Sequence, residues 1–548
     1  MKTKPIVILL ALAALFFAMI LPPEAYANGK LAVILCATFA FLIALSERRI
    51  PPTFVKIGAI IFGLLLAHTF LLSIDRYRSL DTISSLWAYY CLIGFFAYST
   101  AGQEKYLAGA MVALSIIVAG YGLYQYFWGF DQVYNYIFYA ASDQVVKVPA
   151  LQRIAERRVS STLALPGTLW GFLICAIPFH GLFWNRQRWL NGVLLLSLGL
   201  LLTAGFLTRS FGFLLGLFVL AVTTMLLKHS RVLWTRVTPV IIILVVAGGL
   251  FYSGRRDAIQ GQNPAGLRFK NWISAWNMFG DNPLGTGLNT FGVLYPVYMQ
   301  PEANETQFVH NTLFQMLAEL GYPLLVGLAV VIVVNADRLR LKERLNRAKS
   351  SHRFWLLPAL AAWIVHNLID INVYFESVGV LGAVTIGALL AREQIQFQRI
   401  SKTSIALVSI FAIAVIAFSA VACISSELKV RAQIEFENKK LRTAVETLAV
   451  AQRVNPINSS LYHDQGEILL NLYHQTHEQG FLTEATEAFR QAIVLSPKKS
   501  GSHVGYSLCL STAKRIPEAI AQIRIAQQLY PSSAYVQSIA QLMDQSIQ

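Results

Sequence analysis

The residues best suited to chemistry lie in a polar segment, 252–308, and at the start of the apolar segment that follows it. The polar segment holds four prominent cations, Arg255, Arg256, Arg268 and Lys270, and the apolar segment carries His310 near its start. In membrane proteins, Lys and Arg are concentrated in cytoplasmic loops, so cations in an outer loop are unusual. This exception predicts a binding site for an anionic ligand.

A second group of cations precedes the apolar segment 162–184. Its members are Lys147, Arg153, Arg157 and Arg158. Arginine binds phosphate oxygens through two parallel hydrogen bonds, which suits a diphosphate attached to a lipid. Attraction to anionic lipid headgroups is the alternative. The acidic residues of these loops are scattered, without an Asp-x-Asp pair or a histidine cluster, so no metal site is expected.

A polar stripe continues from His310 along the next predicted helix. Asn311, Gln315, Glu319 and Tyr322 are four, four and three residues apart, so they share one helix face. Ionisable groups inside a membrane span usually face a cavity, which favours a functional Glu319. The alternative is a structural carboxylate that is hydrogen-bonded to a neighbouring helix.

His366 and Asp370 form a further candidate pair near the outer end of a predicted span, 354–374. Their spacing of four residues predicts that both lie on one face of a helix. An aspartate can fix the tautomer of a nearby histidine, which favours a supporting role in a site. A polar pair at a helix end is an equally simple interpretation.

The elements that must position these residues include a predicted surface helix, 266–281. Its aromatic and aliphatic face comprises Phe269, Trp272, Ile273, Trp276 and Phe279, and its polar face comprises Lys270, Ser274, Asn277 and Asp281. Two tryptophans outside the spans suit the lipid headgroup layer. Arg268 lies in the first turn, where a lipid-linked phosphate is expected; a plain interfacial anchor is the alternative.

The composition places these segments in a membrane. The chain has 548 residues, of which 55% are hydrophobic and 14% are charged, and its mean hydropathy is +0.52. These values exclude a soluble globular protein. About thirteen stretches are long and apolar enough to span a bilayer: 5–22, 30–45, 54–73, 82–99, 106–128, 162–184, 189–207, 210–227, 237–251, 309–334, 354–374, 377–391 and 403–424. The predicted fold is all-α, with a membrane domain over 1–424.

The distribution of Lys and Arg predicts the topology. With the N-terminus in the cytoplasm, the loops on that side hold more Lys and Arg than the outer loops. The net charge of +16 therefore reflects membrane anchoring and not nucleic-acid binding. An odd number of spans places the polar tail, 425–548, outside the cytoplasm.

The tail contains an internal repeat. Pro456, Pro497 and Pro531 are each preceded by two alanines and one larger apolar residue at constant distances. These residues are Ala444, Leu448 and Ala451, then Ala485, Phe489 and Ala492, then Ala519, Ile523 and Ala526. Small residues at fixed positions let paired helices approach closely, and a proline ends each pair. The pattern resembles the tetratricopeptide repeat, an α-solenoid that binds proteins or peptides of many kinds.

The membrane part resembles the superfamily of O-antigen ligases and O-antigen polymerases, which includes bacterial O-linked protein oligosaccharyltransferases. The matching residues are Gly266-Leu267-Arg268-Phe269, Trp272, Trp276, Asn282-Pro283-Leu284-Gly285-Thr286-Gly287, Phe291, His310-Asn311-Thr312-Leu313-Phe314-Gln315 and Ala318-Glu319-Leu320-Gly321. Weaker agreement covers Arg158 to Pro166, Thr208, Ser210, His366 and Asp370.

Two positions depart from the family pattern. Gly167 follows Pro166, where the family usually has asparagine. In Thr208-Arg209-Ser210, the arginine stands two places earlier than the family arginine, which is a turn of about 200° on a helix. Arg209 takes the family role only if the helix starts later.

The resemblance implies a metal-independent, inverting glycosyltransferase without a cofactor, in the biosynthesis of lipopolysaccharide or another surface polysaccharide. The protein would act at the outer face of the bacterial cytoplasmic membrane. Its donor would be a glycan on undecaprenyl diphosphate, and its acceptor would be lipid A core, a growing glycan or a protein. His310 would be the catalytic base, and Arg268 with Arg158 or Arg209 would bind the diphosphate.

The resemblance also assigns supporting positions to Glu319, Asn311, His366 and Asp370. Two other functions remain open from the residues themselves: a multi-pass anion or solute transporter, and a membrane scaffold whose tail binds another protein. A transporter would usually show two related halves, and residues 1–424 show no convincing internal repeat. A scaffold function does not account for the arginines and His310.

Overall fold

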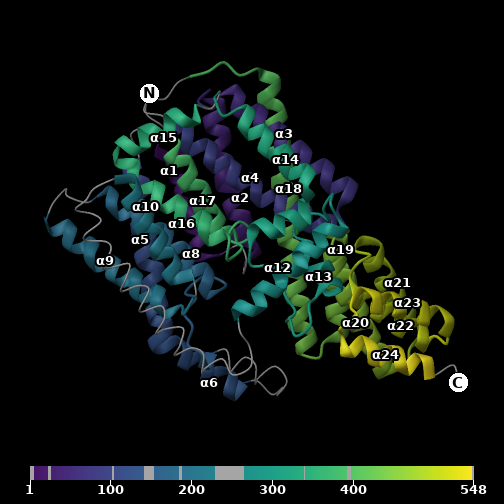
Figure 1. The fold of residues 1–548 in the computed structure, drawn as a ribbon. Helices are drawn as coiled ribbons and strands as arrows, with labels where there is room; N and C mark the ends of the chain where they lie inside the picture. Colours follow the sequence, from purple (N-terminus) through teal and green to yellow (C-terminus); the bar gives the residue numbers. More distant parts are fainter. Residues whose placement is uncertain are drawn as a thin grey trace. The chain divides into compact units, whose positions relative to one another are not determined.

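The computed structural model describes residues 5–22, 26–100, 104–140, 154–183, 188–210, 212–228, 264–337, 340–391 and 397–545. Within these ranges every regular element is a helix and none is a strand (Figure 1), which confirms the all-α prediction. The chain forms two compact units, and it passes between them several times. The first comprises Met1–Ala59, Ser85–Gln262 and Ile332–Ile413, and the second comprises Ile60–Ser84, Asn263–Val331 and Ala414–Gln548.

The first unit is a bundle of mostly apolar helices, with the charged helix α15 (Leu341–Ser350) as an exception. The other elements of this unit are α1 (Pro5–Ile20), α2 (Ala27–Ser46), most of α4 (Arg76–Ser99), α5 (Glu104–Tyr124), α6 (Phe130–Ala140), α8 (Pro166–Ala176), α9 (Arg188–Leu207), α10 (Gly212–Lys228), α16 (Leu356–Asn367) and α17 (Glu376–Leu389). Helix α10 packs on α8 and α16. Trp170 of α8 is fully buried there, and its indole Nε1 donates to the Gly212 carbonyl at 2.7 Å. This bond fixes the start of α10 against α8.

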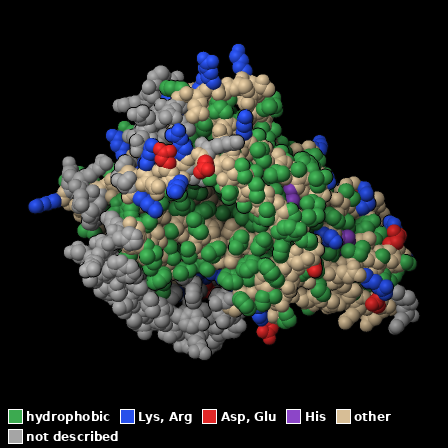
Figure 2. Space-filling model, turned by 45° about the horizontal axis from the view of Figure 1, so that its top comes forward, with side chains coloured by type: hydrophobic (Ala, Val, Ile, Leu, Met, Phe, Trp, Pro, Cys, Tyr) green, Lys and Arg blue, Asp and Glu red, His purple; other side chains and the backbone are tan. Residues whose placement is uncertain are grey.

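Seven helices are long and apolar enough to cross a membrane, and four shorter apolar helices accompany them among the described residues. Twelve of the thirteen predicted spans fall on helices, and 237–251 lies outside the described residues. Many large apolar side chains are exposed, among them Leu71 at 80% and Leu196 at 78%. Hydrophobic side chains also cover much of the face shown in Figure 2. Exposed aliphatic surface on this scale is typical of a protein that faces lipid.

The second unit surrounds two short helices, α12 (Pro264–Asp281) and α13 (Phe291–Tyr298). Their buried residues Ala275, Met278 and Phe291 pack with Val309 and Ala318, which flank the start of α14 (Thr312–Val334). The ends of α3 (Pro52–Leu72) and α18 (Lys402–Glu437) also belong to this unit.

The tail completes the second unit as a run of antiparallel hairpins. It comprises α19 (Leu441–Val454), α20 (Ser459–Thr476), α21 (Gln479–Leu495), α22 (Ser500–Thr512), α23 (Ile516–Leu529) and α24 (Ala534–Gln545), drawn in olive to yellow in Figure 1. Helices α20 and α21 pack most extensively, followed by α22 and α23. Pro497 and Pro531 each follow the second helix of such a hairpin, as the repeat predicted.

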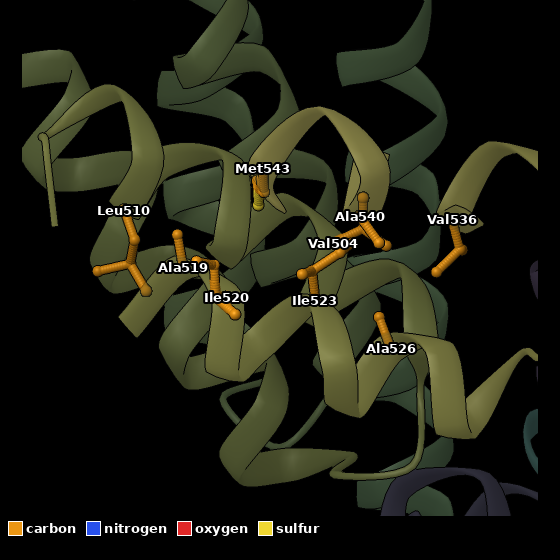
Figure 3. Packing of buried hydrophobic residues seen from close by; sticks show 9 residues of the cluster. All are labelled: Val504, Leu510, Ala519, Ile520, Ile523, Ala526, Val536, Ala540 and Met543. Atoms are coloured by element: carbon orange, nitrogen blue, oxygen red, sulfur yellow. The ribbon is translucent and has the colours of Figure 1, made fainter. Parts of the chain in front are cut away.

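The repeated apolar positions form the core of the tail. All six repeat alanines are completely buried, and Leu448, Phe489 and Ile523 are 1% exposed. In the last hairpin, Ala519, Ile523 and Ala526 pack with Val536 and Ala540 of α24 (Figure 3). Alanine at these positions lets the helix axes approach, because no longer side chain separates them. Helix α18 is continuous through the predicted domain boundary at 424, which stays a prediction.

Candidate functional site

Glu319 organises the centre of the site. Its carboxylate accepts hydrogen bonds from the backbone N–H groups of Asn289 at 2.7 Å and Phe291 at 3.1 Å. The side-chain amide of Gln315 donates to the same carboxylate at 3.1 Å. Glu319 is fully buried, and its bond to Phe291 satisfies an N–H group in the first turn of α13. The geometry therefore favours a structural carboxylate, one of the two alternatives that the sequence left open.

Helix α14 is kinked directly after Glu319. Gly321 has φ 69° and ψ 168°, a conformation that side chains rarely permit. A β-carbon there would lie 2.4 Å from the Pro283 carbonyl oxygen, and one at Gly285 (φ 85°) would lie 2.4 Å from the Glu319 carbonyl oxygen. Gly287 N–H also donates to the Glu319 carbonyl at 2.8 Å. The backbone of segment 282–287 thus packs directly against the backbone of the kink. This is possible because Gly285 and Gly321 have no side chains.

His310 has a left-handed backbone conformation, with φ 58°. This conformation costs a residue with a side chain about 1–3 kcal/mol and persists only where surrounding contacts impose it. The Gln315 side-chain oxygen accepts from Val309 N–H at 3.1 Å, and Trp272 Nε1 donates to the His310 carbonyl at 3.4 Å. The backbone is therefore held on both sides of the imidazole.

Asn311 caps helix α14. Its side-chain oxygen accepts from the backbone N–H groups of Leu313 at 3.0 Å and Phe314 at 3.1 Å. An asparagine cap stabilises a helix start and fixes the direction in which the chain enters it. Asn311 therefore supports the position of His310.

Arg268 is the fifth residue of α12, directly after its first turn. It is half-buried, and it has no hydrogen-bond or ion-pair partner among the described residues. Trp272 stands one turn further along the same face and donates to the His310 carbonyl. Helix α12 therefore connects a guanidinium group that is available for a ligand to the backbone of His310.

The predicted faces of α12 hold only in part. Phe269 and Trp276 are exposed, as expected for an interfacial helix. Ser274, predicted on the polar face, is completely buried and donates to the Tyr298 carbonyl at 2.8 Å. Buried Asn271 accepts from the Tyr295 hydroxyl at 2.8 Å, and burial raises the pKa of Tyr295 to about 12, which keeps this donor protonated. Helix α13 covers the polar face through hydrogen bonds.

Arg158 and Arg209 lie on two paired segments of the first unit. Arg158 Nε donates to the Thr208 carbonyl at 3.3 Å, and Arg209 Nη1 donates to the Glu156 carbonyl at 3.1 Å. Residues 208–210 form a turn, and α10 begins only at Gly212. Arg209 therefore lies before the helix, and the rotation of about 200° that a helix would impose does not apply to it. Arg157 instead pairs with Asp131, and Lys147, Arg153, Arg255 and Arg256 lie outside the described residues.

The prediction that His366 and Asp370 share one face of a helix is wrong. Helix α16 ends at Asn367, so Asp370 lies in the following turn. The partner of His366 Nδ1 is the Asn372 side-chain amide at 2.7 Å, a residue that sequence reasoning missed. With this amide donating, a neutral His366 carries its proton on Nε2.

The surroundings of Gly167 explain why this chain has no asparagine at that position. A β-carbon at this position would lie 2.7 Å from Asp370 Oδ2. The Asp370 carboxylate therefore occupies the space that an asparagine side chain would need. Both His366 and Asp370 are buried in the first unit.

Two polar residues near the glycine motif also escaped the sequence analysis. His68 of α3 donates from Nε2 to the Leu284 carbonyl at 2.9 Å, and Ser79 donates to the Leu288 carbonyl at 3.0 Å. Both anchor the segment that Glu319 binds. A histidine in an otherwise apolar span was the available signal for His68.

Within the described residues, no group of three or more His, Cys, Asp or Glu side chains could hold a metal ion. The expected metal independence stays a prediction.

Comparison with known families gives one match in the region of this site. Residues 195–329 match the family described as O-antigen ligase, a range that includes Arg209, Arg268, His310, Asn311 and Glu319. No curated protein matches the chain. A solved structure, the first TPR of Spaghetti (RPAP3) bound to HSP90 peptide SRMEEVD, is similar over 23% of this chain and 93% of that chain, at 14% identity and a TM-score of 0.21. At that score the similarity carries no argument. The chain is a multi-pass membrane protein that carries a domain of the O-antigen ligase superfamily at residues 195–329.

Proposed function

We propose that this protein transfers a glycan from undecaprenyl diphosphate to an acceptor at the outer face of the bacterial cytoplasmic membrane. The family match supports glycan transfer of the ligase or polymerase type. The observation that carries the finer proposal is the left-handed backbone of His310 at the start of α14. A side chain held in an unfavourable conformation by tertiary contacts is typical of functional sites.

In the proposed reaction, the acceptor hydroxyl gives its proton to neutral His310 while its oxygen attacks the anomeric carbon of the donor. The bond between that carbon and the phosphate oxygen breaks, and its electron pair leaves with the diphosphate. Attack opposite the leaving group inverts the anomeric centre, and no metal ion takes part. Arg268 stabilises the departing charge. Arg158 and Arg209 have the same task by family resemblance.

The remaining residues of the family pattern have positioning roles. Asn311 holds the start of α14 directly after His310, and Glu319 holds the backbone of residues 289–291 against α14. His366 and Asp370 position the elements of the first unit. The charge bias of the loops supports a cytoplasmic N-terminus and an outer tail of tetratricopeptide type. Lipid A core, a growing glycan and a protein hydroxyl are the candidate acceptors.

The test uses purified protein in liposomes with an oligosaccharide on undecaprenyl diphosphate, in the presence of EDTA. Candidate acceptors are added in turn, and release of undecaprenyl diphosphate is followed. His310→Asn removes the base but tolerates the left-handed backbone, so the fold is preserved. We expect acceptor-dependent release by the wild type and a loss of about 100-fold or more in His310→Asn.

Two neighbouring cations provide a matched control. Arg268→Gln removes a guanidinium group without a partner among the described residues, whereas Lys270→Gln removes an ammonium group already bound to Glu302 and the Pro301 carbonyl. We expect a large loss only in Arg268→Gln. If folded wild-type protein releases no diphosphate with any acceptor, glycan transfer is wrong, and transport or scaffolding becomes the better assignment.

A further inference from the structure

The tail of the second unit contains a groove of about 740 Å³. Its walls come from α20, α22, the start of α24 and the end of α18, together with Phe489 of α21 and Tyr530 between α23 and α24. Among the lining residues that the structure describes, Glu305 alone comes from outside the tail; it belongs to the loop between α13 and α14. The groove therefore includes part of the segment that leads to His310.

The lining of the groove suits a polypeptide. The lining combines aromatic and aliphatic side chains, such as Phe436, Ile468 and Tyr535, with the hydrogen-bonding side chains of Gln433, Asn471 and Ser533. An extended polypeptide can pack its side chains on the apolar lining residues and form hydrogen bonds between its backbone amides and the polar ones. The groove thus matches the mixed chemistry of a peptide better than that of a purely apolar ligand.

The charges of the groove have one sign. It is lined by the carboxylates of Glu305, Asp464 and Glu467, and none of the described lining residues is Lys or Arg. Lys429 neutralises Asp464 at 2.9 Å, and His463 lies 3.4 Å from Glu467.

Glu305 differs from the other two carboxylates. It accepts a hydrogen bond from the Tyr530 hydroxyl and has no ion-pair partner among the described residues. Burial and the adjacent carboxylate raise the pKa of Tyr530, so this donor stays neutral. Glu305 is therefore a carboxylate of the groove that a cation of the ligand can neutralise.

The loop that carries Glu305 is held firmly as far as His310. The Tyr295 hydroxyl, which shares its one proton between Asn271 and this loop, lies 3.0 Å from the Asn304 carbonyl. Gly292 of α13 approaches Gln307 so closely that a β-carbon would lie 2.8 Å from its α-carbon. Val309 N–H is bound to Gln315. Glu305 and His310 therefore stand at two ends of one short, well-anchored segment.

We infer that this groove binds an extended polypeptide segment carrying Lys or Arg, whose cation pairs with Glu305. The groove then delivers the bound polypeptide to the loop that ends at His310. In combination with the proposed function, on which this last step rests, the acceptor of the glycan is a protein.

The experiment selects ligands without assuming their sequence. Full-length protein in nanodiscs is screened with a phage-displayed library of random nonapeptides, and the affinities of enriched peptides are measured by fluorescence anisotropy. We expect the enriched peptides, once aligned, to share a Lys or Arg at one position. Glu305→Gln should weaken these peptides up to about fivefold, the usual worth of an exposed ion pair. The preference should decrease with added salt.

Glu302→Gln is the matched control. It removes the same charge from the same loop, but Glu302 pairs with Lys270 and does not line the groove. Its peptide affinities should stay at the wild-type value. Tyr530→Phe removes only the hydroxyl that Glu305 accepts from, so affinity for cationic peptides should be kept or increased. This second variant keeps the inference testable if Glu305→Gln misfolds.

Three results would overturn the inference: no enriched peptide, enriched peptides without a fixed Lys or Arg, or equal losses in Glu305→Gln and Glu302→Gln. Binding of labelled maltoheptaose that depends on Glu305, without peptide binding, would assign the groove to a glycan instead. Peptide binding is measured without the lipid donor. A failure of glycan transfer with normal peptide binding therefore rejects only the proposed function, and the reverse result rejects only the groove.

Discussion

At the scale of single residues, the site is a short chain of buried hydrogen bonds that ends at His310. Gln315 is its central member, because its oxygen accepts from Val309 N–H and its nitrogen donates to Glu319. Glu319 in turn binds the backbone of Asn289 and Phe291. Each of these groups is buried, so a group that loses its partner cannot form a hydrogen bond to water instead.

Gln315→Met tests this chain of bonds. The substitution keeps the length of the side chain but leaves Val309 N–H without its acceptor. It also removes the Gln315 donor from Glu319 Oε1, which keeps its bond from Phe291 N–H. We expect a loss of about 1–3 kcal/mol in the free energy of unfolding, measured by denaturant titration in detergent micelles. Glycan transfer should fall more than this loss explains, because His310 is no longer held. A variant with wild-type activity would show that the backbone conformation does not depend on Gln315.

Lys499 in the tail makes a pH-dependent prediction. Burial, with help from Lys429 and Arg78, lowers its pKa from 10.5 to about 8. The unfolded chain therefore binds more protons than the folded chain between pH 8 and 10.5, and stability rises with pH across that window. Below pH 8 the charged lysine costs its full penalty. Lys499→Met should stabilise the protein by about 1–3 kcal/mol at pH 7, and the gain should shrink towards pH 10.5.

Thermal unfolding of both proteins between pH 7 and 10.5 measures this difference. A gain that does not change with pH would assign the effect to packing and not to the charge.

At the scale of elements, helix α14 depends on its cap and on its kink. Asn311→Ala removes two side-chain bonds to backbone N–H groups and should cost about 1 kcal/mol. Asn458 caps α20 in the same manner, by accepting from Ser460 N–H at 3.1 Å. Asn458→Ala should therefore cost a similar amount of stability in thermal unfolding. Only Asn311→Ala should also slow glycan transfer, since His310 adjoins this cap alone.

Some elements could be predicted from the sequence, and the reason is visible in their residues. The alanines at 444, 485 and 519 repeat at positions where only a small side chain fits, so the hairpins of the tail were foreseen. The spacing of Gln315 and Glu319 placed them together for a related reason, because a helix fixes which residues share a face, and the structure joins them by a hydrogen bond.

Other features left no local signal. In a membrane protein the apolar face of a helix can point outward, so the periodicity of α12 did not reveal that Ser274 is buried under Tyr298. Helix α16 ends at Asn367 without a glycine or proline, which hid the turn that carries Asp370. Bonds between distant segments, such as His68 to Leu284, depend on tertiary packing that no single window of sequence contains.

At the scale of the whole molecule, the tail is integrated with the candidate catalytic segment. The second unit combines α12, α13 and the tail, and α13 packs on α23. Ser459 at the start of α20 also donates to Asp75 at 3.4 Å. The tail is therefore part of the structure that holds His310, in addition to any ligand that it binds.

Truncation after Glu437 tests this integration. The shortened protein loses α23 and the Tyr530 contact to Glu305, so the loop 299–309 loses one of its walls. We expect its backbone amides to exchange with solvent at least tenfold faster, while α8 in the first unit keeps its protection. Hydrogen–deuterium exchange with mass spectrometry distinguishes the two regions. Unchanged exchange in 299–309 would show that the tail is an independent attachment.

The contact between Gly285 and Gly321 has a consequence for how substitutions combine. Each glycine forms the wall against which the other is packed, so one added methyl group already separates the two backbones. A second methyl group then enters space that the first has opened. Gly285→Ala and Gly321→Ala should therefore be strongly non-additive, with the double variant scarcely less stable than the worse single one. The two positions act as one mutational unit, although they are 36 positions apart in the sequence.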